Sequence, residues 1–295
     1  MFENYRVFKT ELAGKPISFE VGKMCGLSNG SCMVRYGETS VLCNVTASQK
    51  PRDGIDFLPL SVDFEEKLYS VGKIPGSFLK REGRPTDKAI LVCRMIDRPI
   101  RPLFPKDMRN DVTLECLVMS VEPACRPELV AMNGAALATE ISDIPFDGPV
   151  AMTQIGMVNG EVIINPSQEQ WDKGDLQLTV ASREDKIMMI EAGANEIPED
   201  EMIRCIYTAD DQNKKIIEWI KGIVADCGKP KRAYESCAIP EELFNAIKEI
   251  VPPAQMEEAV FTDDKQTREG NVSAFKEKLR EAFADKEEWL AILDE

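Results

Sequence analysis

The chain has 295 residues, 43% of them hydrophobic and 29% charged, which is enough apolar material for a sizeable core and excludes disordered, collagenous and coiled-coil proteins. It contains no histidine, which excludes Ser-His-Asp and Cys-His catalysis and His-containing zinc sites. The net charge of −15 argues at first against a nucleic-acid partner, because lysine and arginine drive phosphate binding.

Short strands dominate the first part of the chain. Apolar and polar residues alternate at 17–21, 32–36 and 40–45, as expected for strands with one buried face. A helix is predicted to begin after Thr86, a suitable N-cap, and to stop at Pro99 and Pro102.

A second helix is expected at 129–141, where several alanines permit close packing on a sheet. Asn159-Gly160 then separates two apolar runs, 155–158 and 161–164, which is a strong hairpin signal. Further strands are expected at 176–182 and 186–191. Strands and helices in this order predict an α+β layered fold.

From about residue 199 the apolar period changes to 3.6, with a break at 228–230. Beyond it, Pro240 opens one predicted helix, Pro252-Pro253 closes it, and a last amphipathic helix presents Phe275 and Leu279. We therefore expect a first domain at 1–232 and a small all-helical domain at 233–295.

The loop at 72–85 is the most informative segment. Residues 73–109 hold ten bases and four acids in an otherwise acidic chain, and glycines and prolines indicate an ordered loop at their start. Phe78 beside Lys80, Arg81 and Arg84 is suited to single-stranded nucleic acid, with the ring stacking on a base. The alternative is a loop with solvated charges and a buried Phe78.

Three arginines follow on the predicted helix. Arg94 and Arg98 share one face, and Arg101 continues it past the proline break. Arginine binds phosphate bidentately, but a structural ion-pair network with Asp97 is the alternative.

Metal and thiol chemistry find little support in the sequence. Asp143 and Asp147 are better explained as turn residues than as metal ligands. The nine cysteines form no C-x-x-C pair and lie mostly in apolar runs, so we expect reduced, buried thiols. A reaction whose nucleophile is the substrate itself, such as inorganic phosphate, suits an arginine-rich chain without histidine.

Several motifs together resemble the bacterial polynucleotide phosphorylase family. They are DFLPLSVDFEEK at 56–67, GKIPGSFLKREGRP at 72–85, RMIDRPIRPLFP at 94–105, YGET at 36–39, NGAA at 133–136 and EAGA at 191–194. The resemblance implies that the first domain is an RNase PH-like core, with the ribosomal protein S5 domain 2-like βαβα fold, and that an all-helical domain follows it.

The resemblance also implies that this chain is an amino-terminal fragment. Members of the family continue into a second RNase PH-like core and KH and S1 RNA-binding domains, which are absent here. Their phosphate and metal sites belong chiefly to that second core, so no catalytic residue and no metal ligand is carried over to this chain. Mg²⁺ and the co-substrate inorganic phosphate are expected at the absent core.

RNA contact is what the resemblance assigns to these residues. By motif, Phe78, Lys80, Arg81 and Arg84 match the loop that lines the central pore of a homotrimeric ring, and Arg94, Arg98 and Arg101 match arginines near the RNA path. The family's loop commonly has two phenylalanines and two arginines, whereas residues 78–81 here read FLKR.

The implied activity of the intact protein is processive 3′-to-5′ phosphorolysis of RNA, which releases nucleoside diphosphates during mRNA degradation. This chain would guide single-stranded RNA and build the ring, with RNA-degradation complex proteins as further partners. The alternative is a non-catalytic RNA-binding and assembly module without turnover of its own. A free-standing RNase PH-type enzyme is less consistent with the helical appendage and the pore-loop motif.

Overall fold

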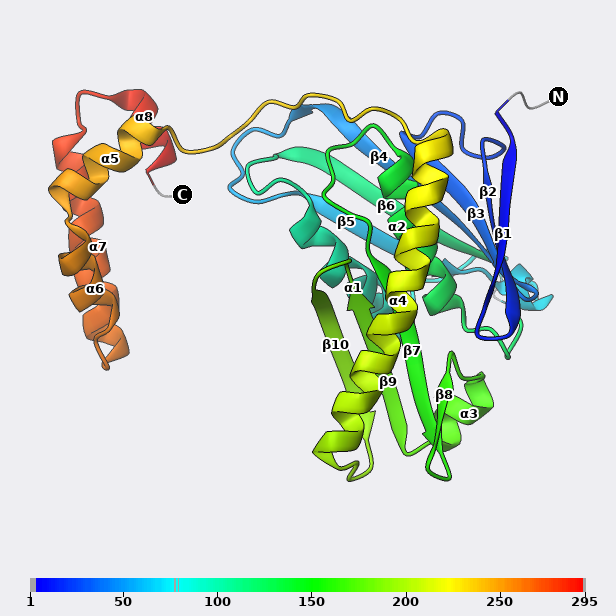
Figure 1. Ribbon diagram of the computed structural model, residues 1–295. Coiled ribbons are helices and arrows are strands. Elements are labelled where there is room, and N and C mark those ends of the chain that lie inside the picture. The colour runs from blue at the N-terminus through cyan, green and yellow to red at the C-terminus, as the bar shows by residue number, and fades with distance from the viewer. Residues whose placement is uncertain (1–3, 77, 79, 294–295) are drawn as a thin grey trace. The chain divides into compact units, whose positions relative to one another are not determined.

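The computed structural model describes residues 4–76, 78 and 80–293 and divides into two units between Glu235 and Ser236 (Figure 1). The division lies three residues beyond the domain boundary expected from the sequence. Unit 1 contains two sheets and the helices that pack on them, and the described part of unit 2 is helical.

The larger sheet of unit 1 has six strands in the order β1-β2-β3-β4-β6-β5. Neighbouring strands are antiparallel except β5 and β6, which pair in parallel. The residues at 17–21, 32–36 and 40–45 are confirmed as strand residues. The strands are β1 (Arg6–Leu12), β2 (Lys15–Val21), β3 (Gly30–Tyr36), β4 (Thr39–Pro51), β5 (Leu60–Glu66) and β6 (Asn110–Ser120).

The second sheet has four strands in the order β10-β9-β7-β8, all paired antiparallel. At its predicted hairpin, Asn159 and Gly160 have φ values of 52° and 80°, the left-handed conformation that a tight two-residue turn requires. The short helix α3 (Gln168–Lys173) follows, opened by a capping box at Ser167. The strands are β7 (Ala151–Val158), β8 (Glu161–Ile164), β9 (Leu176–Ser182) and β10 (Ile187–Ala194).

Helix α1 (Asp87–Ile100) begins as predicted, because the Thr86 side chain accepts a hydrogen bond from the Ala89 N–H. The predicted stop at Pro99 is wrong, because Pro99 lies inside the helix, which ends at Ile100. In the last turn the proline removes only the hydrogen bond to the carbonyl four residues earlier, and its fixed φ suits a helix. The chain continues as a 3₁₀ turn, η2 (Arg101–Leu103).

Helix α2 (Pro127–Ile141) is buried along almost its whole length and contacts β3, β4 and β6 of one sheet and β7 of the other. Proline at its first position suits the helix start, which lies two residues before the predicted one. A Cβ at Gly134 would lie only 2.6 Å from both Cys43 Sγ and Val34 Cγ2. The glycine therefore lets the helix approach the sheet closely.

The long helix α4 (Glu199–Cys227) runs across β7 and β9 and completes the core of unit 1 (Figure 1). Its apolar face is buried through Ile216, Ile217 and Ile220. The helix ends before Gly228, so the predicted period of 3.6 and its break are confirmed.

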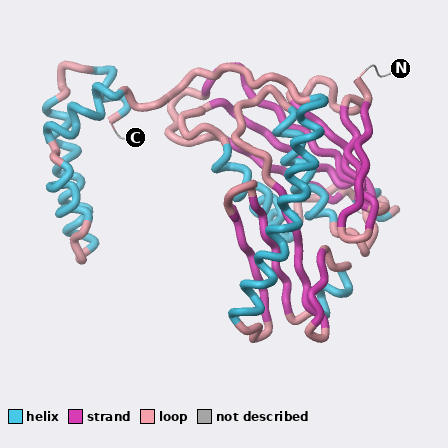
Figure 2. Tube along the Cα trace, viewed as in Figure 1, coloured by secondary structure: helices cyan, strands magenta, loops and turns pink. Residues whose placement is uncertain are grey.

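Unit 2 has a small core of its own, to which Leu243, Val251, Leu279 and Phe283 contribute. Pro240 precedes the first helix, as predicted. The helices, drawn in cyan in Figure 2, are α5 (Glu241–Ile250), α6 (Pro253–Val260), α7 (Lys265–Ala282) and α8 (Glu287–Ile292).

The cysteines are reduced, as expected from the sequence. All nine cysteines are free, and five of them are buried. Within the described ranges, no helix is both long and apolar enough to cross a membrane.

Candidate nucleic-acid interface

The loop at 72–85 joins the 3₁₀ turn η1 (Leu68–Val71) to α1. Gly72 has φ 70°, a left-handed conformation that lets it end η1. The Glu82 carboxylate accepts a hydrogen bond of 3.0 Å from the Leu68 N–H, so both ends of the loop are held to the same turn.

Phe78 projects from this loop with 98% of its surface exposed. The alternative prediction, in which the Phe78 ring is buried in the core, is therefore wrong. Ile74 in the same loop is also largely exposed. An exposed aromatic ring offers a face on which an unpaired base can stack.

Three cations accompany the ring: Lys80, Arg81 and Arg84 are exposed. Among the described residues they have no side-chain hydrogen bond or ion pair, so their charges remain available to a ligand. Lys80 has φ 51°, which is unusual for a residue with a side chain and marks a locally constrained backbone.

A cavity of about 490 Å³ lies beside the loop, between the end of β5 and the start of α1. Arg84 lines it. The acids that β5 contributes are engaged, because Glu65 pairs with Lys67 and Glu66 lies 3.7 Å from Lys88. Arg84 is therefore not neutralised by either carboxylate.

The three arginines after the loop differ in their surroundings. Arg94 is exposed and unpaired within the described part of the chain, whereas Arg98 Nη1 lies 3.2 Å from Glu191 Oε2 of β10. Arg101 makes two hydrogen bonds to Asp97, at 2.7 and 3.0 Å, and donates to the Leu58 and Leu60 carbonyls. The ion-pair alternative thus describes Arg101, whose guanidinium joins α1 to the start of β5.

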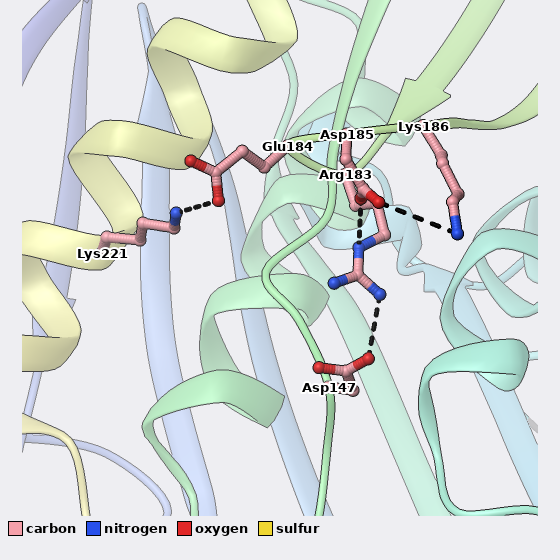
Figure 3. A network of polar contacts seen from close by, with 6 residues as sticks. All are labelled: Asp147, Arg183, Glu184, Asp185, Lys186 and Lys221. Atoms are coloured by element: carbon pink, nitrogen blue, oxygen red, sulfur yellow. Dashed lines mark hydrogen bonds and ion pairs between the residues drawn. The ribbon is translucent and has the colours of Figure 1, made fainter.

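Asp143 and Asp147, the weak metal candidates, lie in separate polar contacts. Asp143 accepts a hydrogen bond of 2.8 Å from the Asn29 amide. Figure 3 shows Asp147 with Arg183, whose Nη1 lies 2.9 Å from the carboxylate and whose Nε lies 2.8 Å from Asp185. The hydrogen bond that Arg183 donates to the Asp147 carboxylate raises the pKa of Arg183.

These contacts are those of a hydrogen-bonded turn residue for Asp143 and of an ion-pair partner for Asp147. The same network continues through Glu184, which pairs with Lys221 of α4 (Figure 3). Among the residues that the structure describes, no group of three or more Cys, Asp or Glu could hold a metal ion.

Two acids that bear on the interface were missed by sequence reasoning. Glu82 tethers the loop, and Glu191 neutralises Arg98 from a strand 93 residues further along the chain. No local pattern signals either contact, because both partners are brought together only by the fold.

Two parts of the chain match known families. Residues 13–145 match the 3′ exoribonuclease family, domain 1, and residues 148–212 match the 3′ exoribonuclease family, domain 2. Together these matches cover most of unit 1.

Curated relatives share high identity with the chain. It is 58% identical to the polyribonucleotide nucleotidyltransferase of Lachnoclostridium phytofermentans over 99% of this chain and 42% of that protein. The identity is 51% to that of Ruminiclostridium cellulolyticum and 50% to that of Clostridioides difficile, over 95% and 96% of this chain and 40% of each relative. The chain thus spans about 40% of the length of the curated relatives it matches.

Solved structures agree on the fold. The crystal structure of rice (Oryza sativa) Rrp46 superimposes with a TM-score of 0.55 at 12% identity, over 76% of this chain and 96% of that one. A chain of the Archaeoglobus fulgidus exosome with RNA bound to the active site gives 0.54 at 16% identity, over 74% and 88%. The predicted α+β, RNase PH-like fold is confirmed.

Proposed function

Because the chain belongs to the 3′ exoribonuclease family, we propose that it is the RNA-guiding part of a polyribonucleotide nucleotidyltransferase. In this proposal the intact protein degrades RNA from its 3′ end. Inorganic phosphate attacks the phosphorus of the terminal phosphodiester, the 3′ oxygen of the preceding nucleotide leaves and takes up a proton, and a nucleoside diphosphate is released. One phosphodiester P–O bond is broken and one phosphoanhydride P–O bond is formed, so the reverse reaction adds a nucleotide to the RNA and releases phosphate.

The observation that carries the RNA-guiding role is the exposed Phe78 beside the cations Lys80, Arg81 and Arg84, which have no charged partner among the described residues. The cations attract the phosphate backbone, and the ring stacks on a base without demanding a particular sequence. Arg94 extends the positive surface along α1. Arg98, partly neutralised by Glu191, contributes less, and Arg101 acts by fixing the end of the helix.

The remaining features of the intact protein are proposed from the family. Three copies form a ring that brings their loops together at a central pore. The protein acts in the cytoplasm, alone or with other RNA-degrading proteins. Mg²⁺ and phosphate serve the reaction, but the described residues do not fit a Mg²⁺ site, since Asp143 and Asp147 are engaged elsewhere. We assign no metal ligand and no catalytic residue to this chain.

A second candidate is an RNA-binding and assembly module without turnover of its own. It is favoured for the isolated chain, because the described residues include exposed cations beside an exposed ring but no cluster of metal-binding acids. The two candidates differ in chemistry and agree on RNA contact.

The test is release of nucleoside diphosphate from poly(A) by the chain, with Mg²⁺ and phosphate present or omitted, in parallel with filter binding of the same RNA. Binding without release supports the guiding role. Phosphate-dependent release would place an active site within these residues. Absence of both binding and release would refute the proposal.

A further inference from the structure

A slot of about 320 Å³ opens in unit 1 between α1 and the second sheet, and no described residue of the loop at 72–85 lines it. Helix α1 contributes the apolar side chains of Leu91, Val92 and Met95. Strand β10 contributes Ala192 and Gly193. We call this space the α1–β10 slot, and its volume is that of a site for one small organic molecule.

The slot also contains polar side chains from deep in the fold. Arg126, Glu128 and Gln154 line it and are only 8%, 2% and 1% exposed. Arg126 pairs with Glu128 through Nη2, and its guanidinium lies 3.8 Å from the ring centre of Trp171, which also lines the slot.

Several polar atoms of these side chains are left without a partner in the described structure. They are the donors Arg126 Nε and Nη1 and the acceptors Glu128 Oε2 and Gln154 Oε1. Native proteins rarely leave buried donors and acceptors unpaired. A ligand carrying both acceptors and donors on one edge would satisfy them.

The charges of the slot argue against a simple anion. The cations Lys88 and Arg126 are balanced by the acids Glu128 and Glu191. Glu128 also lies in the first turn of α2, where it occupies the positive end of that helix. Burial lowers the pKa of Arg126, which shows that its charge is poorly solvated there. A neutral ring with a polar edge fits this balance better than phosphate does.

We propose that the α1–β10 slot binds a nucleobase. Its flat faces lie against the apolar side chains of α1 and against Ala192 and Gly193, and its edge pairs with unpartnered atoms of Arg126 and Gln154. The base comes either from a free nucleotide or from a nucleotide of RNA. This inference uses none of the cations of the proposed RNA-guiding loop and stands independently of that role.

Gly193 offers a direct test, because the strand leaves space at this position. A Cβ there would meet only Gln177 Oε1, at 3.8 Å, and Gln177 itself lines the slot, so we expect a valine at this position to fold normally and to occupy the slot. Ala194→Val is the matched control, since Ala194 follows in the same strand but does not line the slot. Leu91→Trp fills the slot from the exposed side of α1 and serves as a second variant.

The experiment is calorimetric titration of the full chain with the four nucleoside 5′-monophosphates, ribose 5-phosphate and inorganic phosphate. At least one monophosphate is expected to bind, and the two ligands without a base are not. Gly193→Val and Leu91→Trp should each weaken that binding by about tenfold or more, whereas Ala194→Val leaves it unchanged.

Failure of all four nucleotides to bind would overturn the proposal. Equal binding of ribose 5-phosphate, or unchanged affinity in both slot-filling variants with native circular dichroism, would do the same. A Lys80→Ala/Arg81→Ala variant should bind the mononucleotide normally, which separates this site from the RNA-guiding loop. Titrating that variant with a trinucleotide then identifies the source of the base, because slot-dependent binding indicates RNA and its absence a free nucleotide.

Discussion

The cations of the loop at 72–85 make a quantitative prediction for RNA binding. Lys80, Arg81, Arg84 and Arg94 are exposed and unpaired among the described residues, so each is free to contact one phosphate. For single strands each contact adds about 0.7 to the slope of log affinity against log salt. Four contacts give a slope of about −2.8, and the Lys80→Ala/Arg81→Ala variant should reduce it to about −1.4.

The assay is filter binding of a single-stranded oligonucleotide between about 50 and 200 mM salt. Lys214→Ala/Lys215→Ala removes the same charge from α4 and should leave the slope near the native value. An unchanged slope in the loop variant would show that these cations do not touch the RNA. An equal decrease in both variants would show a general effect of net charge instead.

Three further predictions concern stability and reactivity. Gly134→Ala should lower the free energy of unfolding in urea by about 1–3 kcal/mol, because its Cβ would meet Cys43 and Val34. Gly222→Ala has open space around it in α4 and should raise that free energy by about 0.4–1 kcal/mol. Equal effects of the two substitutions would contradict the packing argument. Burial raises the pKa of the Glu140 carboxyl, so its charge costs stability at neutral pH that is regained as the pH falls through the folded pKa. Glu140→Gln should therefore be more stable than the native chain at about pH 7.5, with the difference shrinking towards pH 4, and a difference independent of pH would refute this cause. Burial also raises the pKa of the Cys43 thiol well above its usual range, so iodoacetamide followed by mass spectrometry should label Cys43 only after unfolding, and rapid labelling of the native chain would show that the core opens.

The sequence predicted correctly the turns, caps and helix ends that depend on a few neighbouring residues. The Asn159-Gly160 turn, the Thr86 cap and the break at Gly228 were all confirmed, since each depends on neighbours within a few residues. Strands β5 and β6 were not predicted. β5 carries acids on its partly exposed face and pairs in parallel with a strand more than forty residues later, so only the assembled sheet defines it.

The interface shows the same limit. The sequence identified the loop and offered Asp97 as a partner for Arg94 or Arg101, and the structure pairs it with Arg101, four residues away. It could not identify the Leu58 and Leu60 carbonyls that hold the same guanidinium, or Glu191 opposite Arg98, because tertiary folding alone makes these pairs neighbours.

The position of α2 has a consequence for how unit 1 unfolds. This helix belongs to the segment matching domain 1 of the family, yet it packs against β7 of the segment matching domain 2 as well as against β3, β4 and β6. Opening either segment therefore exposes apolar side chains of the other, because α2 shares one buried cluster with Ala151 and Met152 of β7. We therefore expect the amides of α2 to exchange with deuterium only through global unfolding, and both sheets to lose protection in one cooperative step. The two family domains would then fold together as a single unit, and neither would fold alone.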